Sequence, residues 1–148
     1  MNREFTTEEE RSKLSIQFSV AADITLKAGH WIKPRKLLDY ELVYFPRGSN
    51  TEYISQSAGS YVLKEPCILI TRPQELHEYR FDSVHPTRHL FVHFDGLPPF
   101  EECFPRLADA AQNPVVYLPE HSLIPQLMQQ ILFYFHKRPS RWRSLTKA

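Results

Sequence analysis

The sequence is poor in glycine and cysteine, and it lacks both a charge excess of one sign and a long apolar run. Its 148 residues include 4 glycines and 2 cysteines, and 18 Lys and Arg residues stand against 17 Asp and Glu. A net charge of +1 offers no broad attraction to a phosphate backbone. We therefore expect this chain not to bind nucleic acid by itself.

The cysteines and the N-terminus indicate the compartment. Cys67 and Cys103 form neither a CxxC pair nor a dense framework, so we expect free thiols in the reducing cytoplasm. The N-terminal stretch MNREFTTEEERSK is charged from its start and lacks the apolar region of a signal peptide. No later stretch approaches the length of a membrane span, so no membrane partner is expected.

What the sequence does contain favours β structure. It has 42% hydrophobic and 13% aromatic residues, enough for one domain with a core, and its 12 prolines suit short strands and bends. Leu14, Ile16, Phe18 and Val20 alternate with other residues, as in a half-buried strand. Further strands are predicted over residues 39–45, 52–57, 61–63, 67–71, 77–81, 88–94 and 114–118. Short strands joined by turns predict an antiparallel sandwich or barrel.

The end of the chain changes period. Between Ser122 and His136 apolar residues recur at helical spacing, which predicts one amphipathic helix. Its apolar stripe is formed by Leu123, Leu127, Ile131 and Phe135. That stripe can either meet its twin in a dimer or pack back onto the domain's own barrel, and the sequence leaves both open.

The stretch RHLFVHFD raises the question of a site, because His89, Phe91 and His93 share one face of any strand it forms. The two histidines lie four residues apart, roughly 13 Å along a strand, which is too far for both to bind one metal ion without a bend. Taken singly, each histidine is more often a hydrogen-bonded interior residue than a ligand.

The neighbouring residues favour a small polar guest instead. Tyr79, Glu41 and the basic pair Lys33 and Arg35 would add hydroxyl and charged groups to a ring-lined interior, which suits a polar molecule with apolar faces. The face that Glu41 occupies is not decided by the sequence. It shares one face with Val43 and Phe45, while Tyr40, Leu42 and Tyr44 occupy the other.

Three stretches in order, DYELVYFPRG, LKEPCILITRPQELHEY and PTRHLFVHF, resemble the N-terminal regulatory domain of AraC-family transcriptional regulators. This resemblance implies a mainly β, cupin-like jelly-roll barrel that holds an effector, often a sugar, followed by dimerisation helices. It also implies a homodimer whose DNA contacts come from a helix-turn-helix domain outside this chain. The implied organisation is an N-terminal arm over residues 1–13, a barrel over 14–118 and a helical region over 119–148.

The resemblance also carries a set of ligand contacts by position, at Lys33, Tyr79, His89 and Phe91. The arabinose-responsive member has arginine and tryptophan where this chain has Lys33 and Phe91, which leaves the ligand open. Together with the interior residues named above, the predicted ligand-binding set is Lys33, Arg35, Glu41, Tyr79, His89, Phe91 and His93.

The combined expectation is a sensing and dimerising domain with no cofactor and no enzymatic activity. Two other functions stay open. One is a metal-dependent cupin enzyme, an isomerase or dioxygenase, that uses His77 with His89 or His93 and Glu41. The other is an architectural dimer module whose barrel is packed solid.

Overall fold

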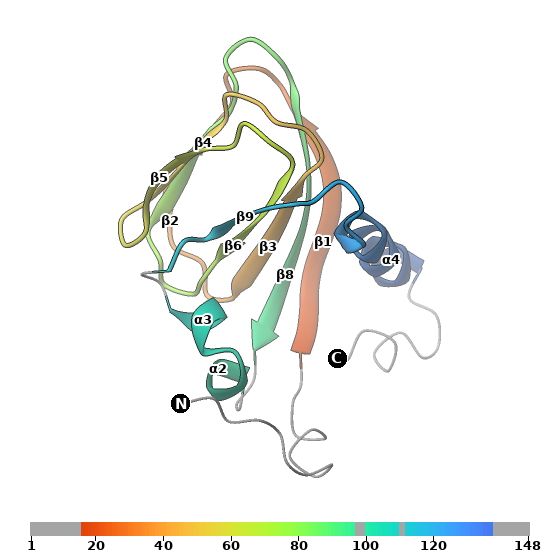
Figure 1. Ribbon diagram of the computed structural model, residues 1–148. Coiled ribbons are helices and arrows are strands. Elements are labelled where there is room, and N and C mark those ends of the chain that lie inside the picture. The colour runs from red at the N-terminus through yellow and green to blue at the C-terminus, as the bar shows by residue number, and fades with distance from the viewer. Residues whose placement is uncertain (1–15, 97–99, 110–111, 138–148) are drawn as a thin grey trace.

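The computed structural model describes residues 16–96, 100–109 and 112–137, and within them two antiparallel sheets face each other (Figure 1). The first sheet has the strand order β1-β8-β3-β6-β9 and the second the order β2-β7-β4-β5. The strands are β1 (Ile16–Leu26), β2 (Trp31–Arg35), β3 (Tyr40–Phe45), β4 (Glu52–Ser55), β5 (Gly59–Val62), β6 (Cys67–Thr71), β7 (His77–Arg80), β8 (Thr87–Gly96) and β9 (Val115–Tyr117).

This strand order is that of a jelly roll. The first eight strands distribute between two four-stranded halves, β1-β8-β3-β6 and β2-β7-β4-β5, and β9 extends the first half at its edge. Double-sheet jelly rolls of this kind include the cupins. The predicted mainly β, cupin-like fold is thus confirmed. The predicted arm over residues 1–13 lies outside the described residues.

One strand escaped the sequence analysis, and proline is the reason. β2 contains Pro34, which cannot donate a hydrogen bond to a neighbouring strand and so argues against a regular strand. In the structure β2 lies at the edge of its sheet, and its pairing with β7 is irregular between Ile32 and Arg35. Pro34 falls in that irregular stretch, where a missing N–H costs little.

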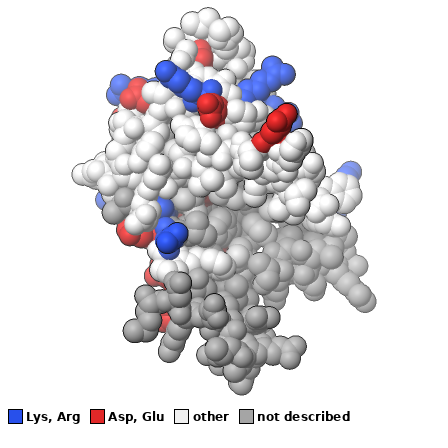
Figure 2. Space-filling view, viewed as in Figure 1, with Lys and Arg blue, Asp and Glu red and all other residues white. Residues whose placement is uncertain are grey.

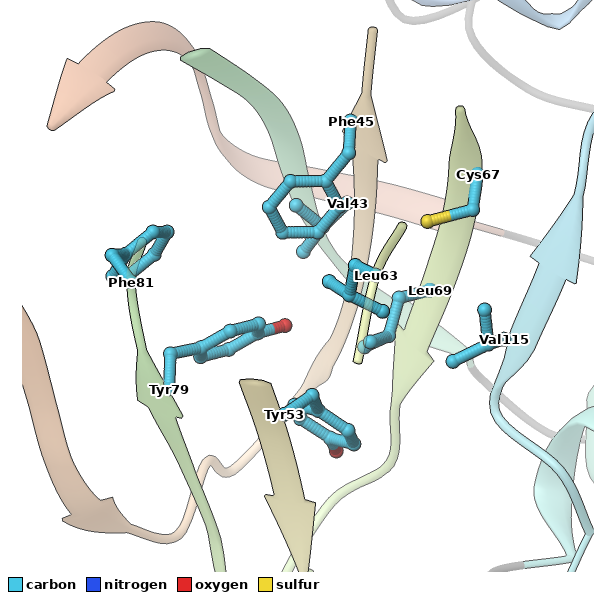
Figure 3. Close-up of a cluster of buried hydrophobic side chains, with 9 residues drawn as sticks. All are labelled: Val43, Phe45, Tyr53, Leu63, Cys67, Leu69, Tyr79, Phe81 and Val115. Carbon is cyan, nitrogen blue, oxygen red and sulfur yellow. The ribbon is translucent and has the colours of Figure 1, made fainter. Parts of the chain in front are cut away.

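The core fills the space between the sheets (Figure 3). It consists of Val43, Phe45, Tyr53, Leu63, Cys67, Leu69, Tyr79, Phe81 and Val115. The open question of β3 is thereby settled, because Val43 and Phe45 belong to this core and Glu41, on the same face, points inward with them.

The opposite face of β3 is also covered, by the helix α4 (Ile124–Lys137), which lies beside β1 in Figure 1. The buried residues of α4 are Met128, Leu132 and Phe135, and they cluster with Tyr44, Leu90 and Val92 of the sheet. Burial on both faces explains why β3 reads as a nearly continuous apolar run. The alternative in which the helix packs onto its own barrel is confirmed.

The predicted dimer stripe is therefore divided. Phe135 is buried against the barrel and Ile131 is partly buried beside it, so neither side chain is fully available to a partner. Leu123 and Leu127, in contrast, are 71% and 50% exposed. Two short helices, α2 (Phe100–Cys103) and α3 (Pro105–Ala108), lie between β8 and β9 in the sequence. No helix among the described residues is both long and apolar enough to cross a membrane.

Candidate functional site

Strand register brings a set of polar side chains together at one end of the barrel. Glu41 of β3 pairs directly with His93 of β8 and with Thr71 of β6, so all three side chains point to the same, inner face. Arg35, at the end of β2, pairs with His77 of β7. Both pairs lie where these strands reach the same end of the barrel.

These side chains form a continuous chain of alternating charge. A terminal nitrogen of the Arg35 guanidinium lies 3.3 Å from Oε1 of Glu41. The second oxygen of Glu41, Oε2, lies 2.8 Å from Nε2 of His93, and Nδ1 of His93 lies 3.0 Å from Oδ1 of Asp39. Ser19, at the irregular point of β1, donates its hydroxyl to Asp39 at 3.2 Å.

The geometry assigns the protonation of His93. Carboxylate oxygens only accept hydrogen bonds, so an imidazole with a carboxylate at each nitrogen carries a proton on both. Burial by itself lowers the pKa of His93, but hydrogen bonds and charge attraction from Glu41 and Asp39 outweigh it and raise that pKa above its usual value. His93 is therefore an imidazolium between two carboxylates.

His77 has the opposite character. Arg35 donates its Nε–H to Nε2 of His77 at 3.2 Å, and Nδ1 of His77 lies 3.0 Å from the carbonyl oxygen of Glu75. A carbonyl can only accept, so Nδ1 carries the proton and Nε2 is the acceptor. Burial lowers the pKa of His77, which keeps the ring neutral.

The metal role that His77 would have in the enzyme alternative does not fit this arrangement. Both of its ring nitrogens are already engaged, so it has no lone pair left for a metal ion without breaking a hydrogen bond. Within residues 16–96, 100–109 and 112–137, no group of three or more His, Cys, Asp or Glu side chains is placed to hold a metal ion.

A wall of rings continues the interior beyond the polar chain. His89 stacks on Phe91 with ring centroids 5.3 Å apart and on Phe45 at 6.1 Å, and Phe91 meets His93 edge to face at 5.8 Å. Nδ1 of His89 donates to the carbonyl of Ile24 at 3.0 Å, and burial lowers the pKa of this histidine. Its neutral ring keeps Nε2 as an acceptor.

Tyr79 supplies a buried hydroxyl that the protein does not satisfy. Figure 3 shows its oxygen directed toward the middle of the core cluster. It meets the geometry of a hydrogen bond with no described residue, but the Thr71 hydroxyl, 3.1 Å from that of neighbouring Tyr53, lies near enough to lower the pKa of Tyr79. Burial raises the pKa of Tyr79 well above its usual range, so the phenol keeps its proton and can donate it.

Two inner-face side chains of β1 are exposed to solvent. Val20 and Ile24 occupy inner-face positions, opposite His93 and His89, yet they are 46% and 40% exposed. β1 and β2 are edge strands of different sheets and are not hydrogen-bonded to each other. The side chain of Arg35 is 36% exposed as well. The polar chain is thus exposed chiefly at Arg35, while its central residue Glu41 is buried.

The structure brings together six of the seven predicted ligand-binding residues, namely Arg35, Glu41, Tyr79, His89, Phe91 and His93. Lys33 is the exception. It is exposed on the outer face of β2, where its ammonium lies 5.9 Å from the centre of the Trp31 ring. Alternation along β2 places Ile32 inward and Lys33 outward.

Sequence reasoning missed Asp39 and Thr71. A period of two from Glu41 would have placed Asp39 on the same face, and that signal was present. Thr71 was not identifiable in this way, because its place beside Glu41 depends on the pairing of β3 with β6.

A cavity of about 500 Å³ lies at the end of the barrel opposite to the polar chain. It is lined by Thr25, Pro46, Arg47, Gly48, Ser49, Asp82, His85, Pro86, Thr87 and Arg88. Asp82 accepts hydrogen bonds from the backbone N–H groups of Asn50, Val84 and His85, which lower its pKa to about 2. This carboxylate ties two loops together.

Figure 2 shows Lys and Arg interspersed with Asp and Glu in the upper part of the visible face, rather than a patch of one sign.

Comparisons with known proteins add likenesses of fold. No family model matches the chain, and no curated protein matches it. The protein YhaK of Escherichia coli is 13% identical with a TM-score of 0.48, over 67% of this chain and 44% of YhaK, so the chain spans less than half of that protein.

Two further solved structures are similar. A cupin-like protein of Thermotoga maritima is 14% identical with a TM-score of 0.45, over 68% of this chain and 79% of that one. A cupin 2 domain-containing protein of Halorhodospira halophila is 15% identical with a TM-score of 0.38, over 71% and 82%. At these values the likenesses identify no function for this chain.

Proposed function

We propose that this chain is the effector-sensing and dimerising domain of an AraC-type transcriptional regulator, and that its barrel binds one small polar molecule, a sugar or sugar derivative. In this proposal the domain has no catalytic role. Contact with DNA belongs to a helix-turn-helix domain outside the 148 residues, and the protein works in the cytoplasm, where the buried Cys67 thiol stays reduced.

The observation that carries the proposal is the unsatisfied hydroxyl of Tyr79. A buried polar group without a partner costs about 1–3 kcal/mol, and a guest oxygen within reach would remove that cost. Phe91 lies on the same inner face and is only partly buried, and the side of its ring that does not stack on His89 is of the kind that stacks on the C–H faces of sugars. The polar chain beside them supplies further donors and acceptors.

A thermal-shift screen with monosaccharides tests the binding function. A ligand present at 100 times its dissociation constant stabilises the folded state by about 2.7 kcal/mol, which is readily detected. We expect one class of compound to give a saturable shift that Tyr79→Phe reduces strongly. Tyr117→Phe removes a hydroxyl from a half-exposed ring on β9 and should leave the shift unchanged. No shift with any compound would contradict the proposal.

The dimer is proposed to form through the exposed residues of α4 and the segment before it, Leu123 and Leu127, because the other half of the stripe is buried against the barrel. Light scattering of the wild type and of the double variant Leu123→Ser, Leu127→Ser tests this. We expect a dimer that the double variant converts to monomer. A wild-type monomer at high concentration would remove the dimer from the proposal for this fragment.

The metal-dependent enzyme is not proposed, because no described feature favours it. Its first requirement is a group of ligands with free lone pairs. The candidate residues His77 and His93 instead use both ring nitrogens in hydrogen bonds with other residues.

A further inference from the structure

We infer that the molecule bound in this barrel carries no net charge, and that Glu41 is the residue that selects against anions. The inference rests on the proposed binding function and makes it more specific. It follows from how the charges of the interior are already matched within the protein.

The described cations of the interior at this end of the barrel, Arg35, His93 and Arg72, each have a carboxylate beside them. Arg35 has Glu41 at 3.3 Å, and the imidazolium of His93 has Glu41 at 2.8 Å and Asp39 at 3.0 Å. Deeper in the same end, Arg72 has Glu75 at 3.9 Å. The chain of Arg35, Glu41, His93 and Asp39 therefore sums to no net charge.

The remaining interior histidines do not alter this balance. His77 accepts a hydrogen bond from Arg35, and His89 donates one to a backbone carbonyl while its ring is buried among aromatic side chains. Both rings are neutral. Lys33, the one other cation that the sequence suggested for the site, points to the outer face.

An anionic guest would meet an unfavourable site. The accessible cation is Arg35, and its guanidinium already faces Glu41, so a guest carboxylate at Arg35 would lie close to a buried carboxylate of the same sign. It would also lose its hydration without gaining an unmatched cation in return. Glu41 is the decisive group because its carboxylate pairs with both cations, Arg35 and His93.

A cationic guest would also bind unfavourably, because both oxygens of Glu41 already pair with cations, Arg35 and His93, which would repel it. A neutral polyhydroxyl molecule has none of these costs. Its hydroxyls can accept from Tyr79 and donate to Nε2 of His89, and its C–H face can lie on the ring of Phe91.

The test compares sugars that differ only in charge. Calorimetric titration or thermal shift would be run at pH 7 with the pairs D-glucose and D-glucuronate, D-galactose and D-galacturonate, and D-xylose beside these as a neutral pentose. We expect the wild type to bind at least one neutral sugar, and to bind its uronate at least tenfold more weakly. Glu41→Gln should reduce the ratio of the affinity for the neutral sugar to the affinity for its uronate at least tenfold, because the substitution leaves Arg35 with no charged partner.

Glu52→Gln is the matched control. It makes the same chemical change on β4, where alternation with buried Tyr53 and Ser55 places Glu52 on the outer face. The ratio of neutral to acidic binding should match the wild type. A ratio unchanged in Glu41→Gln would remove Glu41 as the selecting residue.

The salt dependence of wild-type binding tests whether the guest is charged without the need for a variant, in case Glu41→Gln does not fold. Affinity for a neutral guest should change less than twofold between 50 and 500 mM salt, whereas an anion bound by Arg35 would weaken as salt screens the attraction. If uronates bind as tightly as the neutral sugars or more tightly, the inference fails and the binding function stands. If no sugar of either kind binds, the proposed function fails with it.

Discussion

Replacing Glu41 by Gln removes a negative charge from between two cations while keeping almost the same size and shape. Glu41 is buried, and its two oxygens face Arg35 at 3.3 Å and His93 at 2.8 Å. Gln can still accept one of these hydrogen bonds, but its amide N–H₂ group is directed at the other cation. The expected result is a less stable protein.

The magnitude follows from the two contacts. Breaking a buried ion pair by removing one partner costs about 3–5 kcal/mol. The Arg35 side chain is about one third exposed and its share is screened, so it contributes about 1 kcal/mol or less. The hydrogen bond that Gln retains reduces the His93 share. We expect Glu41→Gln to lower the free energy of unfolding by about 2–3 kcal/mol.

The effect should also depend on pH in a defined direction. The folded-state pKa of His93 is raised, so the stability that His93 contributes is complete below its unfolded pKa of about 6.5 and is lost as pH rises through the folded pKa. His77 and His89 have lowered pKa values and act in the opposite direction, because stability falls as pH drops below about 6.5 toward their folded pKa values. The charge of Glu41 raises both of these pKa values, so Glu41→Gln lowers them further, which adds to the difference at pH 6 and leaves pH 9 unaffected.

The assay is urea denaturation of the wild type, Glu41→Gln and the outer-face control Glu52→Gln at pH 6 and pH 9. The difference between the wild type and Glu41→Gln should be largest at pH 6 and should shrink at pH 9. The control should lie within about 0.5 kcal/mol of the wild type at both values. A difference that is absent, or equal at the two pH values, would refute the imidazolium between two carboxylates.

Three further predictions concern packing and hydrogen bonding. Tyr53→Phe should cost about 1–2 kcal/mol because it removes a buried hydrogen bond. Tyr79→Phe removes a buried hydroxyl without a partner and should raise the stability of the ligand-free protein, by up to about 1–3 kcal/mol. Urea denaturation compares them, and a loss of stability in Tyr79→Phe equal to that in Tyr53→Phe would contradict the assignment. Leu132→Ala should cost about 2–4 kcal/mol by leaving a cavity under α4, whereas Leu127→Ala, at a half-exposed position, should cost much less. Similar losses of melting temperature in the two variants would show that α4 does not pack as described. Gly48→Ala should cost more than about 2 kcal/mol, because its Cβ would lie 1.8 Å from a backbone carbonyl oxygen; a stable variant would show that this loop can move aside.

Much of the fold could be predicted from the sequence because period-two alternation marks strands that are half buried. β7 and β8 were located in this way, and their inward residues Tyr79, His89 and Phe91 do converge in the interior. The strand β2 was missed because Pro34 is evidence against a strand, and only its edge position makes it acceptable.

The site was less predictable because its contacts depend on register. Alternation alone could not choose a face for β3, since both faces are buried, one by the barrel core and the other by α4. The meeting of Glu41 with His93 follows from the pairing of two strands that are far apart in the sequence. Lys33 was placed in the site by resemblance, but alternation along β2 directs its side chain to the outer face.

The unsatisfied hydroxyl of Tyr79 had no signal in the sequence at all. Tyr53 and Tyr79 lie on neighbouring strands with their rings 4.9 Å apart, and Thr71 hydrogen-bonds the hydroxyl of Tyr53 at 3.1 Å but meets that geometry with Tyr79 not at all. This detail is set by packing rather than by any local pattern.

The most direct test of a ligand-binding interior is calorimetric titration of the wild type and of Tyr79→Phe with the neutral sugar that gives the largest thermal shift. We predict one binding site per chain and an affinity at least tenfold lower for the variant. Binding of equal strength in the two proteins, or no heat of binding in the wild type, would contradict the central claim that this barrel holds a polar guest at Tyr79.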